Sequence, residues 1–233
     1  MSFTITPYII TPYIKYGKFR MDYHMYFEII DKIKPHMMEI ADYFKIEYKN
    51  LRYYHIIRYV QEALNVKIIN YSFFSKLNNI IAGSLYVKND NIIICLNSSL
   101  NRGRRIFTIL HEIKHLLIDI PLGISSQFDD HLNIKFEDKS MIEIEADTIA
   151  SYMFSSDTAL EEAIYKLDFT YEELMNEFGY SHEALKVRLR NFIVFSLHET
   201  YQSAEELITN YINGKKSNLL FAIDEAIVKG YYA

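Results

Sequence analysis

The sequence predicts an α+β fold, with a small central β-sheet and a predominantly helical C-terminal part. Apolar residues recur with helical spacing before residue 66 and after residue 100, whereas β-branched runs are concentrated between these positions. The chain has 233 residues, of which 50% are hydrophobic and 24% are charged. This length and composition indicate one globular domain, or one domain with an appendage, and exclude a disordered chain or a disulfide scaffold.

Charge and cysteine content narrow the class of protein further. The formal net charge of −5 argues against a chain whose main role is wrapping nucleic acid. The single cysteine, Cys95, excludes an intramolecular disulfide, and its apolar surroundings predict a buried strand residue rather than a nucleophile. The sequence has no apolar stretch of 18 residues and no signal-like N-terminus, so we expect a cytoplasmic protein without membrane contact.

The first fifty residues, 1–50, are expected to form an arm followed by helices. A tandem of Thr-Pro-Tyr-Ile, at 6–9 and 11–14, favours an extended arm, because proline biases the preceding residue toward extended backbone. This arm either packs on the domain or binds a partner. Residues 22–47 have helical spacing that Pro35 interrupts, which predicts two successive helices.

The middle of the chain supplies the strands. Residues 51–65 have the amphipathic pattern of a helix. The β-branched runs that follow predict three strands, at 66–71, 80–87 and 92–96. Residues 88–91, between the last two runs, are typical of a hairpin connection.

Helices dominate the remaining sequence. Residues 101–118 are expected to form a helix that ends before Pro121, and a loop rich in Ser, Asp and Asn follows. A second helix is expected over residues 140–155. Most of the chain beyond it has helical spacing, including 196–233, which carries no chemical signature.

The first of these helices contains an HExxH motif, His111-Glu112-Ile113-Lys114-His115. Residues four apart lie one above the other on a helix, so both imidazoles can bind one zinc ion. Glu112 lies beside that position and can take a proton from water at the metal. The alternative is a helix whose two histidines are only hydrogen-bonded.

A catalytic zinc site needs a third protein ligand and an open position. Glu143 and Asp147 are four residues apart on the next predicted helix and share one face. Glu143 is the candidate ligand, and Asp147 can accept a hydrogen bond from a ligand histidine. Glu145 points to another side of that helix and is the weaker candidate. Alternatively, Glu143 forms a capping box with Ser140 and serves only the helix N-terminus.

These two helices resemble those of the ImmA/IrrE-type zinc metallopeptidases. That family has an Arg-rich lead-in, a helix of the type RRFTLAHELGH and a later helix of the type ExxANxFA. Here Arg104 to Thr108 precede the HExxH motif, and residues 143–150 match the second helix. The resemblance implies a zincin-like metallopeptidase domain over residues 51–195, followed by a helical extension over 196–233.

The resemblance also implies roles for the site residues. His111, His115 and Glu143 would bind one zinc ion, with manganese as the alternative metal. Glu112 would be the general base. By sequence position alone, three residues are candidates for stabilising the oxyanion: His131, Tyr152 and His182.

Three departures from the family pattern lie close to these residues. Asp147 stands where the family often has Asn, and it can accept the same hydrogen bond. Lys114 replaces the usual Gly before the second histidine, at a position expected to be exposed and away from the metal. Residues 152–155 replace a common Leu-Leu-Met-Pro ending, so the resemblance does not indicate which residues form the floor of the substrate cleft.

A pair of helices over residues 170–194 resembles a helix-turn-helix. Gly179 turns the chain between the helices, and three basic residues lie on the second one: Lys186, Arg188 and Arg190. These residues do not share one face, and the chain is acidic overall. We therefore expect packing rather than direct DNA binding.

The resemblance implies a narrow substrate range. Members of this family typically cleave a helix-turn-helix repressor and so derepress genes of mobile elements or stress responses. Two other interpretations stay open: a non-proteolytic regulator that binds DNA or a partner protein, and the toxin component of a toxin–antitoxin pair. The oligomeric state is open as well.

Overall fold

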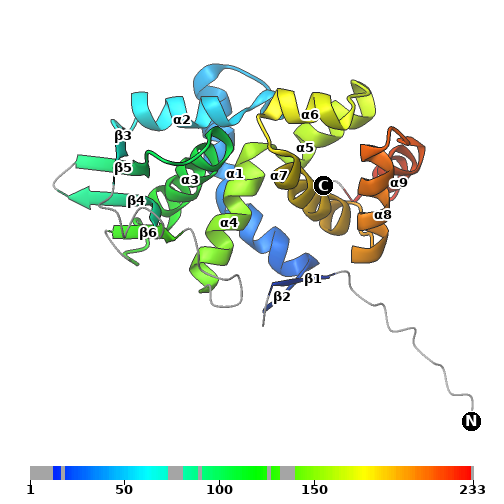
Figure 1. Ribbon diagram of the computed structural model, residues 1–233, viewed down its shortest axis with the longest axis horizontal. Helices are drawn as coiled ribbons and strands as arrows, with labels where there is room; N and C mark the ends of the chain where they lie inside the picture. Colours follow the sequence, from blue (N-terminus) through cyan, green and yellow to red (C-terminus); the bar gives the residue numbers. More distant parts are fainter. Residues whose placement is uncertain are drawn as a thin grey trace, which may run out of the picture.

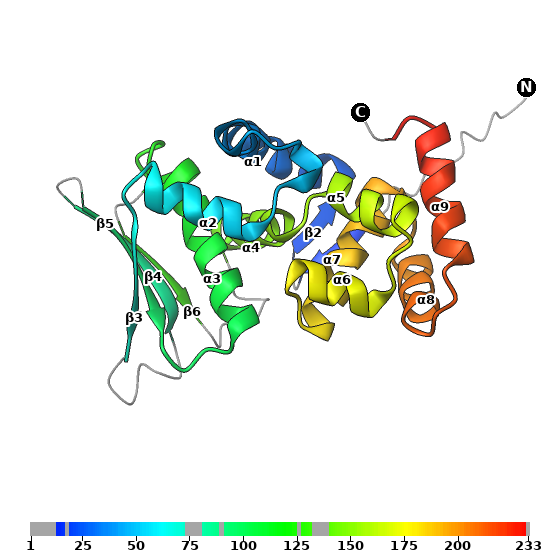
Figure 2. The same cartoon turned by 90° about the horizontal axis from the view of Figure 1, so that it is seen from above.

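A four-stranded sheet lies at one end of the molecule, with helices on one of its faces (Figure 1, Figure 2). The computed structural model describes residues 13–16, 19–72, 81–88, 91–124, 127–131 and 140–231. The strands lie in the order β3 (Lys67–Tyr71), β5 (Asn91–Asn97), β4 (Ile81–Lys88) and β6 (Gln127–His131). β3 and β5 are parallel, and the other neighbours are antiparallel. The three strands predicted from β-branched runs are thereby confirmed.

The fourth strand, β6, corrects the sequence analysis, which expected a loop after Pro121. Its sequence, QFDDH, contains no β-branched run that would mark it as a strand. β6 pairs with the edge of β4, where Phe128 lies opposite Leu85. The strand therefore forms because it pairs with β4, which is distant in the sequence. A local sequence pattern does not reveal such a pairing.

The N-terminal arm is a hairpin in its described part. β1 (Tyr13–Tyr16) and β2 (Phe19–Asp22) pair antiparallel, and the side chain of Ile14 is buried in the core. This burial favours the packing interpretation of the arm. The first Thr-Pro-Tyr-Ile repeat lies outside the described residues.

One continuous helix, α1 (Tyr23–Phe44), replaces the two helices expected on either side of Pro35. Proline removes one backbone donor and disfavours a helix interior. The buried face nevertheless runs through both sides of Pro35, from Ile29 and Ile33 to Met37 and Ile40. Burial of this apolar stripe offsets the cost of the proline.

Two further helices lie between α1 and the sheet (Figure 2). A short 3₁₀ turn, η1 (Tyr48–Asn50), leads into α2 (Tyr53–Glu62), the helix expected within 51–65. α3 (Arg102–Lys114) carries the HExxH motif and continues into a π-helical turn, η2 (His115–Asp119). The last turn of α3 is buried on all sides, because the sheet lies on one side of it and α4 (Met141–Phe154) on another.

The C-terminal helices gather at the opposite end from the sheet (Figure 2). They are α5 (Asp157–Glu161), η4 (Glu162–Lys166), α6 (Tyr171–Phe178), α7 (His182–Asn191), η5 (Phe192–Ser196), α8 (Tyr201–Ile212) and α9 (Ser217–Val228). Gly179 turns the chain between α6 and α7 with a φ of 77°, a left-handed conformation that favours glycine. The predicted helix pair is confirmed as a structural unit.

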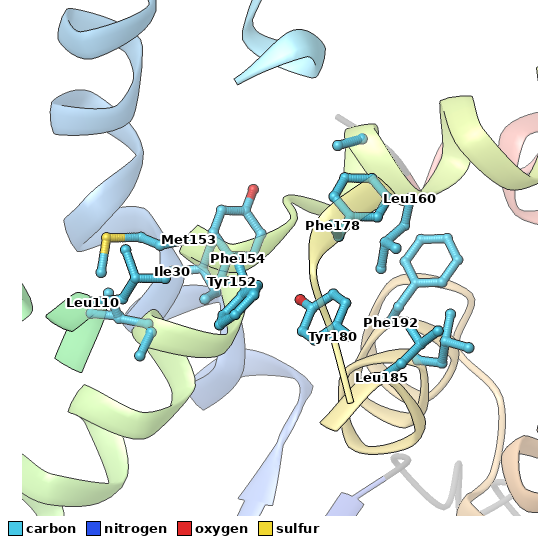
Figure 3. Close-up of a cluster of buried hydrophobic side chains, with 14 of the residues drawn as sticks. Ile30, Leu110, Tyr152, Met153, Phe154, Leu160, Phe178, Tyr180, Leu185 and Phe192 are labelled. Carbon is cyan, nitrogen blue, oxygen red and sulfur yellow. The ribbon is translucent and has the colours of Figure 1, made fainter. Parts of the chain in front are cut away.

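A continuous hydrophobic core joins the two ends. Figure 3 shows Ile30 of α1 and Met153 of α4 near Leu110, with Tyr180, between α6 and α7, and Phe192 of η5 farther along the same core. Helix α4 therefore contacts both the HExxH helix and the C-terminal part. Among the described helices, none combines the length and apolarity needed to cross a bilayer.

The basic residues of α7 are used in packing. Arg188 is fully buried, forms an ion pair with Asp157 and donates to the carbonyl of Ser155 at 2.9 Å. Arg190 and Lys186 both contact Glu205 of α8. These contacts hold α7 against α5 and α8, as the packing interpretation expects.

We predict that Asp157→Ala lowers the free energy of unfolding by about 3–5 kcal/mol, because it leaves the Arg188 cation buried without its carboxylate. The matched control is Lys166→Ala, which removes an exposed ion pair with Glu162 on the neighbouring turn. That change should cost less than about 1 kcal/mol. Guanidinium unfolding of both variants is the measurement, and equal losses would contradict this assignment.

Candidate metal centre

Three side chains from two helices converge on one point. His111 lies in the last turn of α3, His115 begins the π-helical turn η2 that continues it, and Glu143 lies in the first turn of α4. Their ligand atoms all lie within 4.8 Å of one another. The two Nε2 atoms are 3.1 Å apart, and Glu143 Oε2 lies 3.1 Å from Nε2 of His111. The four-residue spacing of the histidines accounts for the convergence.

The donor set fits a zinc ion. Two nitrogen ligands, each about 2.0 Å from a tetrahedral zinc, are about 3.3 Å apart, close to the observed Nε2 separation. The carboxylate of Glu143 also faces His115, with Oε1 3.6 Å from its Nε2. Two imidazoles and one carboxylate leave a fourth tetrahedral position for water or substrate.

The alternative interpretation, in which Glu143 serves only to cap α4, explains the contact of its backbone amide but not the position of its side chain. Its amide donates to Oγ of Ser140 at 3.4 Å, as an N-terminal cap does. Its side chain turns instead to the two histidines. One residue therefore begins α4 and also presents its carboxylate to the centre, which favours the ligand interpretation.

A carboxylate lies behind each histidine ring. Nδ1 of His111 is 3.1 Å from Oδ1 of Asp147, the acceptor expected from the sequence. Nδ1 of His115 is 2.5 Å from Oδ2 of Asp119, which the sequence analysis missed. The signal was available, since Asp119 follows His115 by four residues on the same helix. Such acceptors fix the tautomer in which Nε2 offers its lone pair to a metal.

Burial and these contacts adjust the protonation of the centre. Burial lowers the pKa of His115 below its usual value, although the hydrogen bond to Asp119 acts in the opposite direction. Burial alone would raise the pKa of Glu143, but the contact with His111 lowers it overall. Neutral imidazole and ionised carboxylate are the forms that bind a metal.

Strand β6, which the sequence analysis did not predict, contributes an aromatic ring beside His115. The ring of Phe128 stacks on the imidazole of His115, with centroids 4.1 Å apart and planes inclined by 10°. This contact adds an apolar surface to the hydrogen bond that His115 makes to Asp119. Together they restrict the orientation of His115.

Glu112, the candidate general base, is buried between α3 and the sheet. It approaches Gly83 of β4 closely: a Cβ atom at Gly83 would lie 3.4 Å from Oε1 of Glu112 and only 2.4 Å from Cγ2 of Thr108. Only glycine allows the helix to lie so near the strand. Burial raises the pKa of the Cys95 thiol, and the negative charge of Glu112 raises it further. Because the thiolate is the nucleophilic form, a raised pKa opposes a nucleophilic role for that cysteine.

The prediction that Lys114 is exposed is wrong. Its side chain is fully buried, and Nζ lies 3.0 and 2.8 Å from the two carboxylate oxygens of Asp119. Glu145 provides a second anion at 3.3 Å. The error arose because α4 covers this face of α3, which the local sequence pattern does not show. Two carboxylates compensate the cost of burying the ammonium group.

The structure does not bring two of the three oxyanion candidates to the centre. Tyr152 is buried on the far part of α4, where Tyr48 donates to its hydroxyl at 3.3 Å. His182 begins α7 and contacts Tyr171 and Glu183. His131 ends β6, but its side chain lies outside the described part of the chain, so this candidate stays a prediction.

Comparison with known proteins identifies the family. A family model described as the IrrE N-terminal-like domain, of the peptidase M78 family, matches residues 61–190, more than half of the chain. The chain belongs to this family. M78 is a family of metallopeptidases, and the matched segment contains both α3 and α4. A search among curated proteins finds no match. The division of the chain at residues 50 and 195 stays a prediction.

We predict that Gly83→Ala lowers the free energy of unfolding by about 1–3 kcal/mol, because its Cβ would force Thr108 and α3 away from the sheet. The matched control is Gly103→Ala within α3, where the nearest atom would be 3.7 Å away. That variant should be unchanged or more stable by up to about 1 kcal/mol. Thermal or chemical unfolding distinguishes the two, and equal tolerance would refute the close approach.

Proposed function

We propose that this protein is a zinc-dependent endopeptidase that cleaves one specific intracellular protein, a helix-turn-helix transcriptional repressor. Cleavage would derepress genes of mobile elements or of a stress response. Membership of the M78 family supports peptidase activity. The observation that carries the zinc assignment is the convergence of His111, His115 and Glu143, with a carboxylate behind each imidazole.

In this proposal His111, His115 and Glu143 hold the metal. A bound zinc ion supplies Lewis-acid chemistry, which polarises a carbonyl group and makes water more acidic. Glu112 follows His111 directly in the sequence and would accept a proton from the attacking water through its carboxylate. The same carboxyl group then delivers that proton to the leaving amine, which completes peptide hydrolysis.

The donor set favours zinc over manganese. Two imidazoles and one carboxylate suit zinc, whereas manganese prefers sites made mostly of oxygen ligands. The burial of both histidines further supports a rigid site of low coordination number.

The repressor substrate rests on the resemblance of the two motif helices to ImmA/IrrE-type peptidases. The rival interpretation, a DNA-binding regulator, would need a basic face on α7. Arg188 of that helix is buried, and Arg190 and Lys186 contact Glu205. These contacts leave the peptidase proposal as the better supported one, and nothing in the described residues favours the toxin interpretation.

We predict that Glu112→Gln abolishes cleavage, with kcat reduced by about 10²-fold or more, while zinc remains bound. The amide keeps the size of the side chain but cannot accept the proton. The assay incubates the purified protein with helix-turn-helix repressors encoded beside its gene and follows new N-termini by mass spectrometry. Glu225→Gln, a change on the C-terminal helix α9, is the control and should cleave normally. Undiminished cleavage by Glu112→Gln would remove this residue from the mechanism.

We also predict about one zinc ion per chain in the wild type, and weakened binding in Glu143→Ala, because that change removes one of three protein ligands. Elemental analysis after dialysis against a weak chelator measures both. Glu206→Ala, an exposed carboxylate on α8, should retain the wild-type content. A wild type that takes up no metal when zinc is offered would refute the zinc proposal.

A further inference from the structure

A line of alternating charges leads away from His115 toward the surface. Asp119 accepts from Nδ1 of His115, and Lys114 donates to both oxygens of Asp119. Lys114 also pairs with Glu145 of α4, whose other oxygen lies 2.6 Å from Nζ of Lys32 on α1. The two inner side chains, Asp119 and Lys114, are 2% and 0% exposed, whereas Glu145 is 13% exposed and Lys32 is 43% exposed.

The π-helical turn η2 makes this arrangement feasible. In a regular α-helix a residue faces the residues three and four positions away, whereas a π turn aligns residues five apart. The amide of Ile120 closes the turn on the carbonyl of His115 at 3.0 Å. Asp119 thereby faces His115, four residues back, and Lys114, five residues back. A single carboxylate serves both partners.

The Lys114 contact restricts the Asp119 carboxylate in two ways. Bonds from Nζ to both oxygens oppose rotation of the carboxylate plane, and the charge-assisted contact opposes movement of the carboxylate away from Lys114. Oδ2 accepts from both Lys114 and His115, so movement of the carboxylate would also move the imidazole ring. Phe128 already limits tilting of that ring.

We propose that Lys114 is a positioning residue of the metal centre, which fixes Asp119 and, through Asp119, holds Nε2 of His115 at its ligand position. This inference rests on the proposed zinc site and identifies a residue that tunes it. Lys114 stands where the resembling peptidases usually have glycine. The competing interpretation is an ion pair that only ties α3 to α4.

The test is a double-mutant cycle on zinc affinity. The variants are Lys114→Met, Asp119→Asn and the two combined, and the dissociation constant of zinc is measured on metal-free protein by competition with a chromophoric chelator. Loss of an outer partner of a ligand histidine typically weakens metal binding about 10–100-fold. We expect each single change to do so, and the double variant to bind no more weakly than Asp119→Asn alone, because Lys114 acts through Asp119.

The matched control is Lys49→Met, which removes another lysine that bridges two elements, η1 and η4, at a distance from the centre. Its zinc affinity should stay within about twofold of the wild type, while its stability changes as for a surface ion pair. Lys114→Gln is the second variant, in case Lys114→Met does not fold. The glutamine amide can still donate to Asp119, so its zinc affinity should lie between those of the wild type and Asp119→Asn.

The outcomes separate this inference from the proposed function. A wild type without zinc affinity would refute the metal centre itself. Zinc bound by the wild type and by Lys114→Met or Lys114→Gln with equal affinity would overturn the positioning role and leave the metal centre intact. Additive losses in the double variant would show that Lys114 acts independently of Asp119, which also overturns the proposed route.

Discussion

Two buried imidazoles must present their Nε2 atoms to the same point, and most of the architecture around them follows from this constraint. A hydrogen bond at the other ring nitrogen fixes the tautomer and orientation of a ligand histidine, so each ring needs an acceptor. Asp147 on α4 holds His111, and Asp119 on the π turn holds His115. Helix α3 must therefore lie against α4 and end in a widened turn. Glu143, one helical turn before Asp147, then faces the same point.

Tight packing of α3 on two sides brings the charged side chain of Lys114 into the interior. Gly83 lets the helix approach β4, and the paired carboxylates of Asp119 and Glu145 accommodate the buried Lys114. Helix α4 is held in turn by the core that it shares with the C-terminal helices (Figure 3). The buried ion pair of Arg188 and Asp157 fixes that part of the molecule. The C-terminal helices thus support the helix that carries Glu143, although they contribute no ligand.

Patterns that repeat within one element were predictable from the sequence, and contacts between elements were not. The four-residue spacing indicated both histidines and the Glu143 and Asp147 pair, and β-branched runs indicated β3, β4 and β5. Strand β6 was missed because its pairing with β4 forms it, rather than its own composition. The helix-breaking effect of Pro35 was overestimated, because buried apolar side chains before and after it stabilise α1 as one helix. Lys114 was placed on the surface because the local sequence does not show that α4 covers it. Asp119 is the exception, since its spacing from His115 could have been noticed.

Crystals of the zinc-loaded protein provide the most direct test of the central claim, through anomalous diffraction at the zinc absorption edge. The account predicts one strong peak per chain, bonded to Nε2 of His111, Nε2 of His115 and the carboxylate of Glu143, at about 2.0–2.2 Å. Asp119 and Asp147 should keep their contacts with the two Nδ1 atoms. A zinc-loaded crystal with no peak at this point, or with the Glu143 side chain turned back to cap α4, would contradict it.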